Sequence, residues 1–104
     1  MTAIAGCVGM AGEDHAGLCG RMLHGLRDYG SGKPSIRSFE SAVFGRIPCP
    51  QLPEDRFDNQ PLAGGSRYLL VADVRLDNRE DLARQLGIPR PELETLCDAD
   101  VFLR

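Results

Sequence analysis

The sequence lacks a surplus of positive charge, a long apolar segment, and a basic leader followed by an apolar core. Its formal net charge of −3 gives no basic surface of the kind that nucleic-acid binding requires. No apolar window approaches a membrane-spanning length, and the N-terminus does not read as a secretion signal. We therefore expect neither a nucleic acid nor a membrane as partner, and a cytoplasmic protein.

Metal-binding and disulfide patterns are also missing. The cysteines are widely separated, with no C-x-x-C pair and no histidine at ligand spacing: Cys7, Cys19, Cys49 and Cys97. This spacing predicts no metal site. Because nothing else suggests secretion, we expect buried, reduced thiols in place of a disulfide framework.

The 104 residues, with 42% apolar and 26% charged side chains, predict one small globular domain. Strand patterns cover residues 4–8, 35–39, 42–47 and 67–74, and helical patterns cover residues 15–28, 80–86, 91–96 and 98–104. This order indicates an α+β fold. The last helical pattern has no stop signal, which predicts a truncated domain.

Turn and capping residues separate these elements. Residues 12–14 form an expected turn with helix-capping acids, and Gly30 suits a left-handed C-cap. Asn78 and Asp81 are close to a capping box. The prolines and length of residues 48–58 predict an irregular, mobile loop.

Short segments in a fixed order carry a family resemblance. They are Met1-Thr-Ala-Ile-Ala-Gly6, Arg46-Ile47 followed by Gln60-Pro61-Leu62, Val71-Ala-Asp-Val-Arg-Leu-Asp-Asn78, and Cys97-Asp-Ala-Asp-Val101. Together they resemble the glutamine-hydrolysing (type 2 glutamine amidotransferase) domain at the front of asparagine synthetases. The resemblance covers this whole chain but only about the first half of the family's domain. It implies a partial Ntn-hydrolase αββα sandwich, with helices outside antiparallel sheets.

The residues that perform hydrolysis in that family are altered here. Thr2 stands where the family has its N-terminal cysteine nucleophile, whose own amine is the base. Asp73 and Val74 stand where an asparagine and a glycine form the oxyanion hole. A carboxylate only accepts hydrogen bonds, and one lost oxyanion donor costs about 10²–10³ in rate. We therefore expect the glutaminase activity to be lost.

Two further positions match residues that hold glutamine in the family. Arg46 aligns with the arginine that binds the α-carboxylate, and Asp98 with the aspartate that binds the α-amine. A surface arginine and a helix N-cap aspartate are the alternative interpretations of these residues. Glutamine therefore stays an open candidate ligand.

The resemblance implies a degenerate glutaminase-like domain of an ATP-dependent, amide-forming enzyme, as in β-lactam synthetases and lasso-peptide cyclases. ATP and Mg²⁺ are expected only for a C-terminal synthetase domain, because these residues contain no pyrophosphate loop. Expected partners are that domain or a precursor peptide. Half of such a sandwich would also leave an apolar sheet face exposed. An exposed face of this kind predicts a homodimer, aggregation or a missing segment that covers it. The alternatives are an active, Thr2-dependent amidohydrolase and a non-catalytic binding module.

Overall fold

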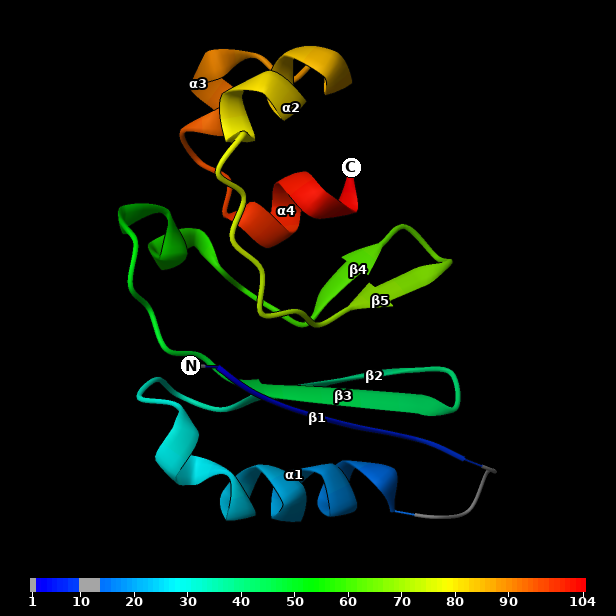
Figure 1. The fold of residues 1–104 in the computed structure, drawn as a ribbon. Helices are drawn as coiled ribbons and strands as arrows, with labels where there is room; N and C mark the ends of the chain where they lie inside the picture. The colour runs from blue at the N-terminus through cyan, green and yellow to red at the C-terminus, as the bar shows by residue number, and fades with distance from the viewer. Residues whose placement is uncertain (1, 10–13) are drawn as a thin grey trace.

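The computed structural model describes residues 2–9 and 14–104, which form a mixed α+β fold with antiparallel sheets (Figure 1). The strands are β1 (Ala3–Val8), β2 (Ser35–Phe39), β3 (Ala42–Ile47), β4 (Leu62–Gly64) and β5 (Tyr68–Leu70). The helices are α1 (His15–Gly25), α2 (Arg79–Leu86), α3 (Arg90–Leu93) and α4 (Asp98–Leu103), with 3-10 helices η1 (Arg27–Tyr29) and η2 (Pro53–Phe57). Met1 of the first family motif, and Gly12 and Glu13 of the expected turn, lie outside the described residues.

The larger sheet has the strand order β1-β3-β2, and both pairings are antiparallel. Its three strands lie where the sequence predicts them. The hairpin between β2 and β3 turns at Glu40, whose φ is +53°. The strand order brings the N-terminal strand β1 against β3, so that Ile4 lies opposite Arg46.

Helix α1 covers one face of this sheet (Figure 1). The core between them consists of small and aliphatic side chains: Ala3, Ala5, Cys19, Leu23, Val43 and Ile47. Alternate residues of a strand point to one face, which explains why Ala3 and Ala5 of β1, and Val43 and Ile47 of β3, lie on the same side of the sheet. A Cβ on Gly45 would lie 2.7 Å from Leu23 Cδ1, so a residue without a side chain lets the helix approach the sheet.

The opposite face of the sheet is apolar and partly open to solvent. Ile4 is 38% exposed and Val8 is 70% exposed. Between them, the ring of Phe44 lies against Gly6, where an added Cβ would come within 2.4 Å of Phe44 Cδ1. Exposed apolar side chains on one sheet face are what a sheet without its full covering layer presents.

The hairpin β4-β5 forms a second, smaller sheet, with Gly65 in a left-handed turn at φ +59°. The strand predicted over residues 67–74 is therefore too long, because only Tyr68–Leu70 pairs with a neighbour. Beyond β5, backbone N–H groups donate hydrogen bonds to side chains and not to a partner strand. Ala72 N donates to Gln60 Oε1 (2.5 Å), and Leu76 N donates to Asp98 Oδ2 (2.9 Å).

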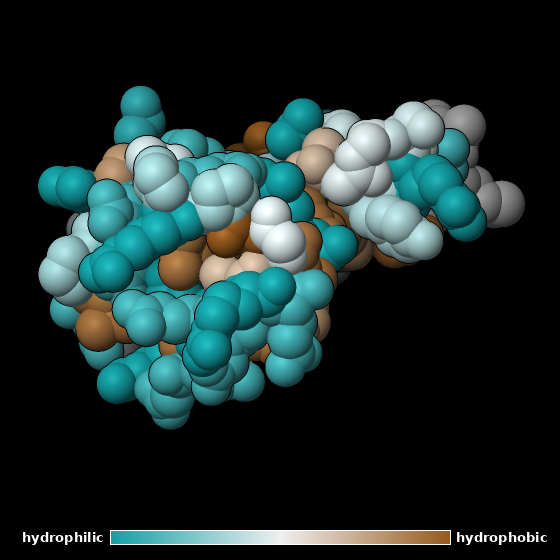
Figure 2. Space-filling model, turned by 90° about the horizontal axis from the view of Figure 1, so that it is seen from above, coloured by the Kyte–Doolittle hydropathy of each residue, from teal (hydrophilic) through white to brown (hydrophobic). Residues whose placement is uncertain are grey.

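Helices α2, α3 and α4 enclose a second apolar cluster of Ala83, Ile88, Leu93 and Val101. Seen from above, the molecule presents hydrophobic surface between hydrophilic side chains (Figure 2). Among residues 2–9 and 14–104, no helix has the length and apolar character needed to cross a membrane.

The predicted N-cap residue of α2 is confirmed in position, whereas that of α4 is wrong. Asn78 occupies the N-cap of α2, but its side chain accepts no capping hydrogen bond within the described chain. The N-cap of α4 is Cys97 and not Asp98, and Cys97 N donates to Asp100 Oδ2 (3.0 Å). Asp98 instead accepts hydrogen bonds from distant segments, which draws its carboxylate away from its own helix end.

The predictions for residues 15–28 and 48–58 also need correction. Helix α1 ends at Gly25, and Gly30 is extended (φ −136°, ψ 153°) in place of a left-handed cap. Gly30 is needed for close packing, since a Cβ there would lie 2.4 Å from Ile47 Cγ2 and 2.6 Å from Ile47 O. The expected mobile loop contains η2, which Asp55 fixes by accepting from Gln51 N and Leu52 N at 2.7 and 2.8 Å.

We predict that Gly30→Ala destabilises the fold by about 1–3 kcal/mol, because the added methyl overpacks against the backbone of β3. Gly25→Ala is the matched control, since a Cβ at Gly25 would meet no atom within 4 Å. Urea denaturation of both variants checks this. Equal stability of the two would contradict the packing explanation.

Candidate functional site

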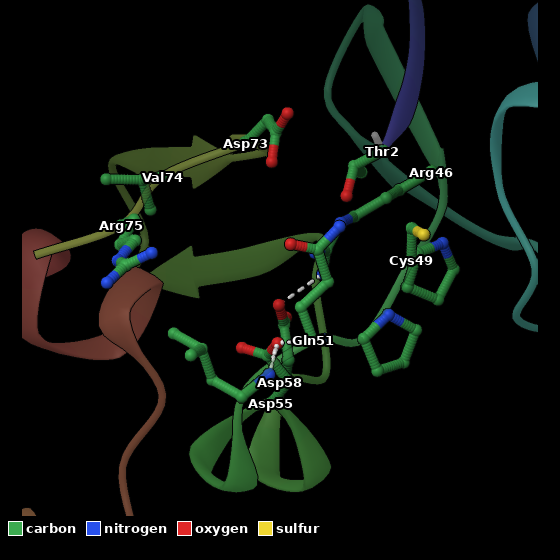
Figure 3. A pocket seen from close by; sticks show the side chains of 12 residues that line it. Thr2, Arg46, Cys49, Gln51, Asp55, Asp58, Asp73, Val74 and Arg75 are labelled. Atoms are coloured by element: carbon green, nitrogen blue, oxygen red, sulfur yellow. Dashed lines mark hydrogen bonds and ion pairs between the residues drawn. The ribbon is translucent and has the colours of Figure 1, made fainter.

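A pocket of about 470 Å³ lies between the start of β1, the end of β3 and the segment after β5 (Figure 3). It is lined by Thr2, Arg46, Pro48, Cys49, Pro50, Gln51, Leu52, Asp55, Asp58, Asp73, Val74 and Arg75. The fold therefore brings together Thr2, Arg46 and the adjacent residues Asp73 and Val74, which come from three segments distant in the sequence. A pocket of this size accommodates a small-molecule ligand.

Arg46 reaches the pocket from the face of β3 that points away from α1. Its Nη1 lies 2.5 Å from Asp58 Oδ2, and the two side chains are only 8% and 10% exposed. Asp58 also accepts from Gln60 N and from Gln60 Nε2, both at 3.2 Å. A buried arginine and a buried aspartate thus neutralise each other at the pocket wall.

Gln60 connects this ion pair to the rest of the site. It is 4% exposed, and its side-chain oxygen accepts the hydrogen bond from Ala72 N at 2.5 Å. Through this contact the buried amide fixes the backbone immediately before Asp73 and Val74. The Gln-Pro motif therefore has a structural role here: it holds the segment after β5 against the pocket.

Thr2 and Asp73 approach the pocket from different segments (Figure 3). Thr2 is half-buried at the start of β1, whereas Asp73 is exposed and Val74 is half-buried on the segment after β5. The pocket therefore contains a hydroxyl and carboxylates. The carboxylate of Asp73, when ionised, can only accept hydrogen bonds from a ligand in this pocket.

Asp98 is not among the described residues that line this pocket. Its carboxylate is 5% exposed and lies 2.7 Å from Arg79 Nη1 through Oδ1. Arg79 Nη2 in turn donates to Leu93 O (2.7 Å) and to Leu96 O. Asp98 thus connects α4 to α2, to α3 and, through Leu76 N, to the segment after β5.

No protein-family model, curated protein or solved structure matches this chain. The chemistry of the site must therefore be argued from its own residues.

Two buried thiols lie outside the pocket. Burial raises the pKa of Cys97 to about 12, and burial also raises the pKa of Cys19. Because the thiolate is the reactive form, neither is a nucleophile at neutral pH. Cys7 and Cys49 are only half-buried, so the prediction of buried thiols holds for two of the free cysteines. Within the described ranges, no group of three or more His, Cys, Asp or Glu side chains is arranged to hold a metal ion.

Sequence reasoning missed Asp58 and Arg79, which partner the two residues assigned to ligand binding. Asp58 lies two positions before the Gln60-Pro61 motif, in a stretch expected to be a mobile loop. Arg79 directly follows the predicted N-cap residue Asn78. Their proximity to recognised motifs was a signal, but the pairing depends on tertiary structure.

We predict that Asp98→Asn destabilises the protein by about 3–5 kcal/mol, because it removes the counter-charge of Arg79, whose side chain is only 16% exposed. Asp81→Asn is the matched control: Asp81 also pairs with an arginine, Arg84, but both side chains are exposed. The control should lose less than about 1 kcal/mol. Chemical denaturation of both variants measures the difference, and equal losses would contradict a structural role for Asp98.

Proposed function

We propose that this chain is a degenerate type 2 glutamine amidotransferase-like domain of an asparagine synthetase-type enzyme, and that it no longer hydrolyses glutamine. The observation that carries the proposal is the common pocket of Thr2, Arg46, Asp73 and Val74. Thr2, Arg46 and the pair Asp73-Val74 belong to three separate motifs of the family resemblance. Residues that share a catalytic site in a family should lie together if the resemblance is real.

The architecture gives further support. The sheet β1-β3-β2 is covered on one face by α1, and the second sheet β4-β5 lies on the side of α2–α4 (Figure 1). Helices outside two antiparallel sheets are the layers of a partial αββα sandwich. Such a partial sandwich also accounts for the exposed Ile4 and Val8 on the inner face of the larger sheet.

The charges of the site argue against glutamine hydrolysis. Asp73 places a carboxylate where negative charge develops in the transition state, and Val74 adds a side chain where the family has none. Arg46 is paired with Asp58, and Asp98 is paired with Arg79. The groups proposed to hold both ends of glutamine therefore have internal partners.

In this proposal the domain serves as a scaffold for a synthetase domain, or for the precursor peptide on which that domain acts. The ATP and Mg²⁺ chemistry belongs to the synthetase domain. The apolar surface around Ile4, Val8 and Phe44 favours such a binding role. Self-association of two copies of this chain through the same face is the competing interpretation. An active Thr2 hydrolase is the alternative, favoured by the position of Thr2 on the pocket.

We predict that the protein releases no ammonia from glutamine above the level of Thr2→Ala, because the oxyanion position is acidic. Ammonia release is measured for both proteins, with mass spectrometry to establish whether Thr2 is the N-terminal residue. Turnover that depends on Thr2 would replace the scaffold proposal with a threonine-dependent amidohydrolase.

A further inference from the structure

A second pocket, of about 760 Å³, lies between η2, α2 and α3, and we call it the α2–α3 pocket. None of the described residues that line it also lines the pocket at Thr2. Its apolar part consists of Ala83, Ile88 and Leu93, from the core of the C-terminal helices, together with Phe57 of η2. Seen from the side of α2 and α3, hydrophobic surface is enclosed by hydrophilic side chains (Figure 2). A pocket of this size and lining suits an apolar side chain of a ligand.

The pairing of the charges around the α2–α3 pocket argues against an anion as its ligand. Four arginines and three glutamates line the pocket. Three of the arginines already have carboxylate partners in the protein, in the pairs Arg79–Asp98, Arg84–Asp81 and Arg90–Glu94. The fourth, Arg56, lies over the ring of Phe57, with its Cζ 4.6 Å from the ring centroid. An anion would therefore compete with contacts that the arginines already make.

Two acidic side chains of the same pocket have no counter-charge. Among the ion pairs of residues 2–9 and 14–104, none includes Glu54 or Glu80. Glu54 is half-buried on η2, and Glu80 is exposed in the first turn of α2. Arg56 is the only lining cation outside an ion pair within these ranges, so the unpaired carboxylates outnumber the unpaired guanidinium. This balance favours a ligand that brings a cation.

The remaining charges favour a peptide over a small organic cation. The exposed guanidiniums of Arg84 and Arg90 line the pocket on the side of the helices, so donors and acidic acceptors occur together. A peptide supplies backbone carbonyls for such donors as well as a basic side chain for the carboxylates. A small cation supplies only the second of these contacts.

We propose that the α2–α3 pocket binds a peptide segment in which a large aliphatic side chain stands beside a lysine. The aliphatic side chain contacts Ile88 and Leu93, and the ammonium lies at the carboxylates of Glu54 and Glu80. Lysine suits this position because its stem packs on apolar surface while its charged end stays in water. The site uses no residue of the pocket at Thr2, so the proposal does not depend on the proposed function.

The test is an NMR titration of the isotope-labelled chain with a short peptide of leucines and lysines, capped at both ends. We expect saturable shifts at the backbone amides of Phe57, Ala83 and Ile88. The same peptide with glutamates in place of the lysines should bind about tenfold more weakly or worse, because it brings like charge to Glu54 and Glu80. A peptide with serines in place of the leucines should lose at least as much, because nothing fills the apolar part.

A double variant, Glu54→Gln with Glu80→Gln, tests the carboxylates directly. It should raise the dissociation constant of the leucine–lysine peptide about threefold to tenfold, which is the range that the loss of two surface ion pairs gives. Asp28→Asn with Glu40→Gln is the matched control, since it removes the same charge from exposed side chains that do not line the pocket. The control should bind the peptide as the wild type does.

Three results would overturn the proposal: no saturable shift with the leucine–lysine peptide, equal affinity for the lysine and glutamate peptides, or equal losses in the two double variants. Shifts centred on Ile4 and Val8 would also overturn it, because the peptide would then lie on the open face of the larger sheet. Acidic residues in a first helical turn also stabilise the helix, and Glu54 and Glu80 occupy such positions. The comparison of peptides on the wild-type chain is unaffected by any loss of stability in the variants.

Discussion

The buried ion pair between Arg79 and Asp98 is the constraint on which the C-terminal half of the structure depends. One guanidinium binds the carboxylate of α4 and the backbone carbonyls of Leu93 and Leu96, while the second oxygen of Asp98 accepts from Leu76 N. Helices of four to eight residues are too short to be stable alone, and their apolar cluster is small. A charge network that contacts every one of these segments therefore sets how they pack.

The same network reaches the pocket through the backbone. The segment after β5 has no partner strand, and it is held at Ala72 by Gln60 and at Leu76 by Asp98. Asp73 and Val74 lie between these two contacts, so buried side chains from separate parts of the chain fix their position. Gln60 also binds Asp58, which pairs with Arg46. The geometry of the pocket thus follows from a chain of polar contacts that begins at the helices and ends at β3.

Local sequence signals predicted the elements whose structure is local. The strands of the β2-β3 hairpin and the helix at residues 98–103 follow from alternation and helical spacing. The strand over residues 67–74 was overestimated because strand propensity does not show whether a partner strand exists. Gly30 was misassigned because its requirement is the distance to Ile47, which no local pattern contains. Of the residues singled out for the site, Thr2, Arg46, Asp73 and Val74 line one pocket and Asp98 does not, and the partners Asp58 and Arg79 depend on contacts between distant segments.

Both charged residues that the family resemblance links to glutamine have protein partners in this structure, and the two pairs differ in kind. Asp98 is fully engaged, with one oxygen on Arg79 and the other on a backbone N–H, so its role is explained by the fold alone. Arg46 forms an ion pair with Asp58 through Nη1, and its Nε has no hydrogen-bond acceptor among the described residues. A residue that only stabilised the fold would be expected to reach the complete arrangement seen at Asp98. Asp98 is therefore explained by the packing of the C-terminal helices alone, whereas the guanidinium of Arg46 keeps one buried donor for which the described residues supply no acceptor.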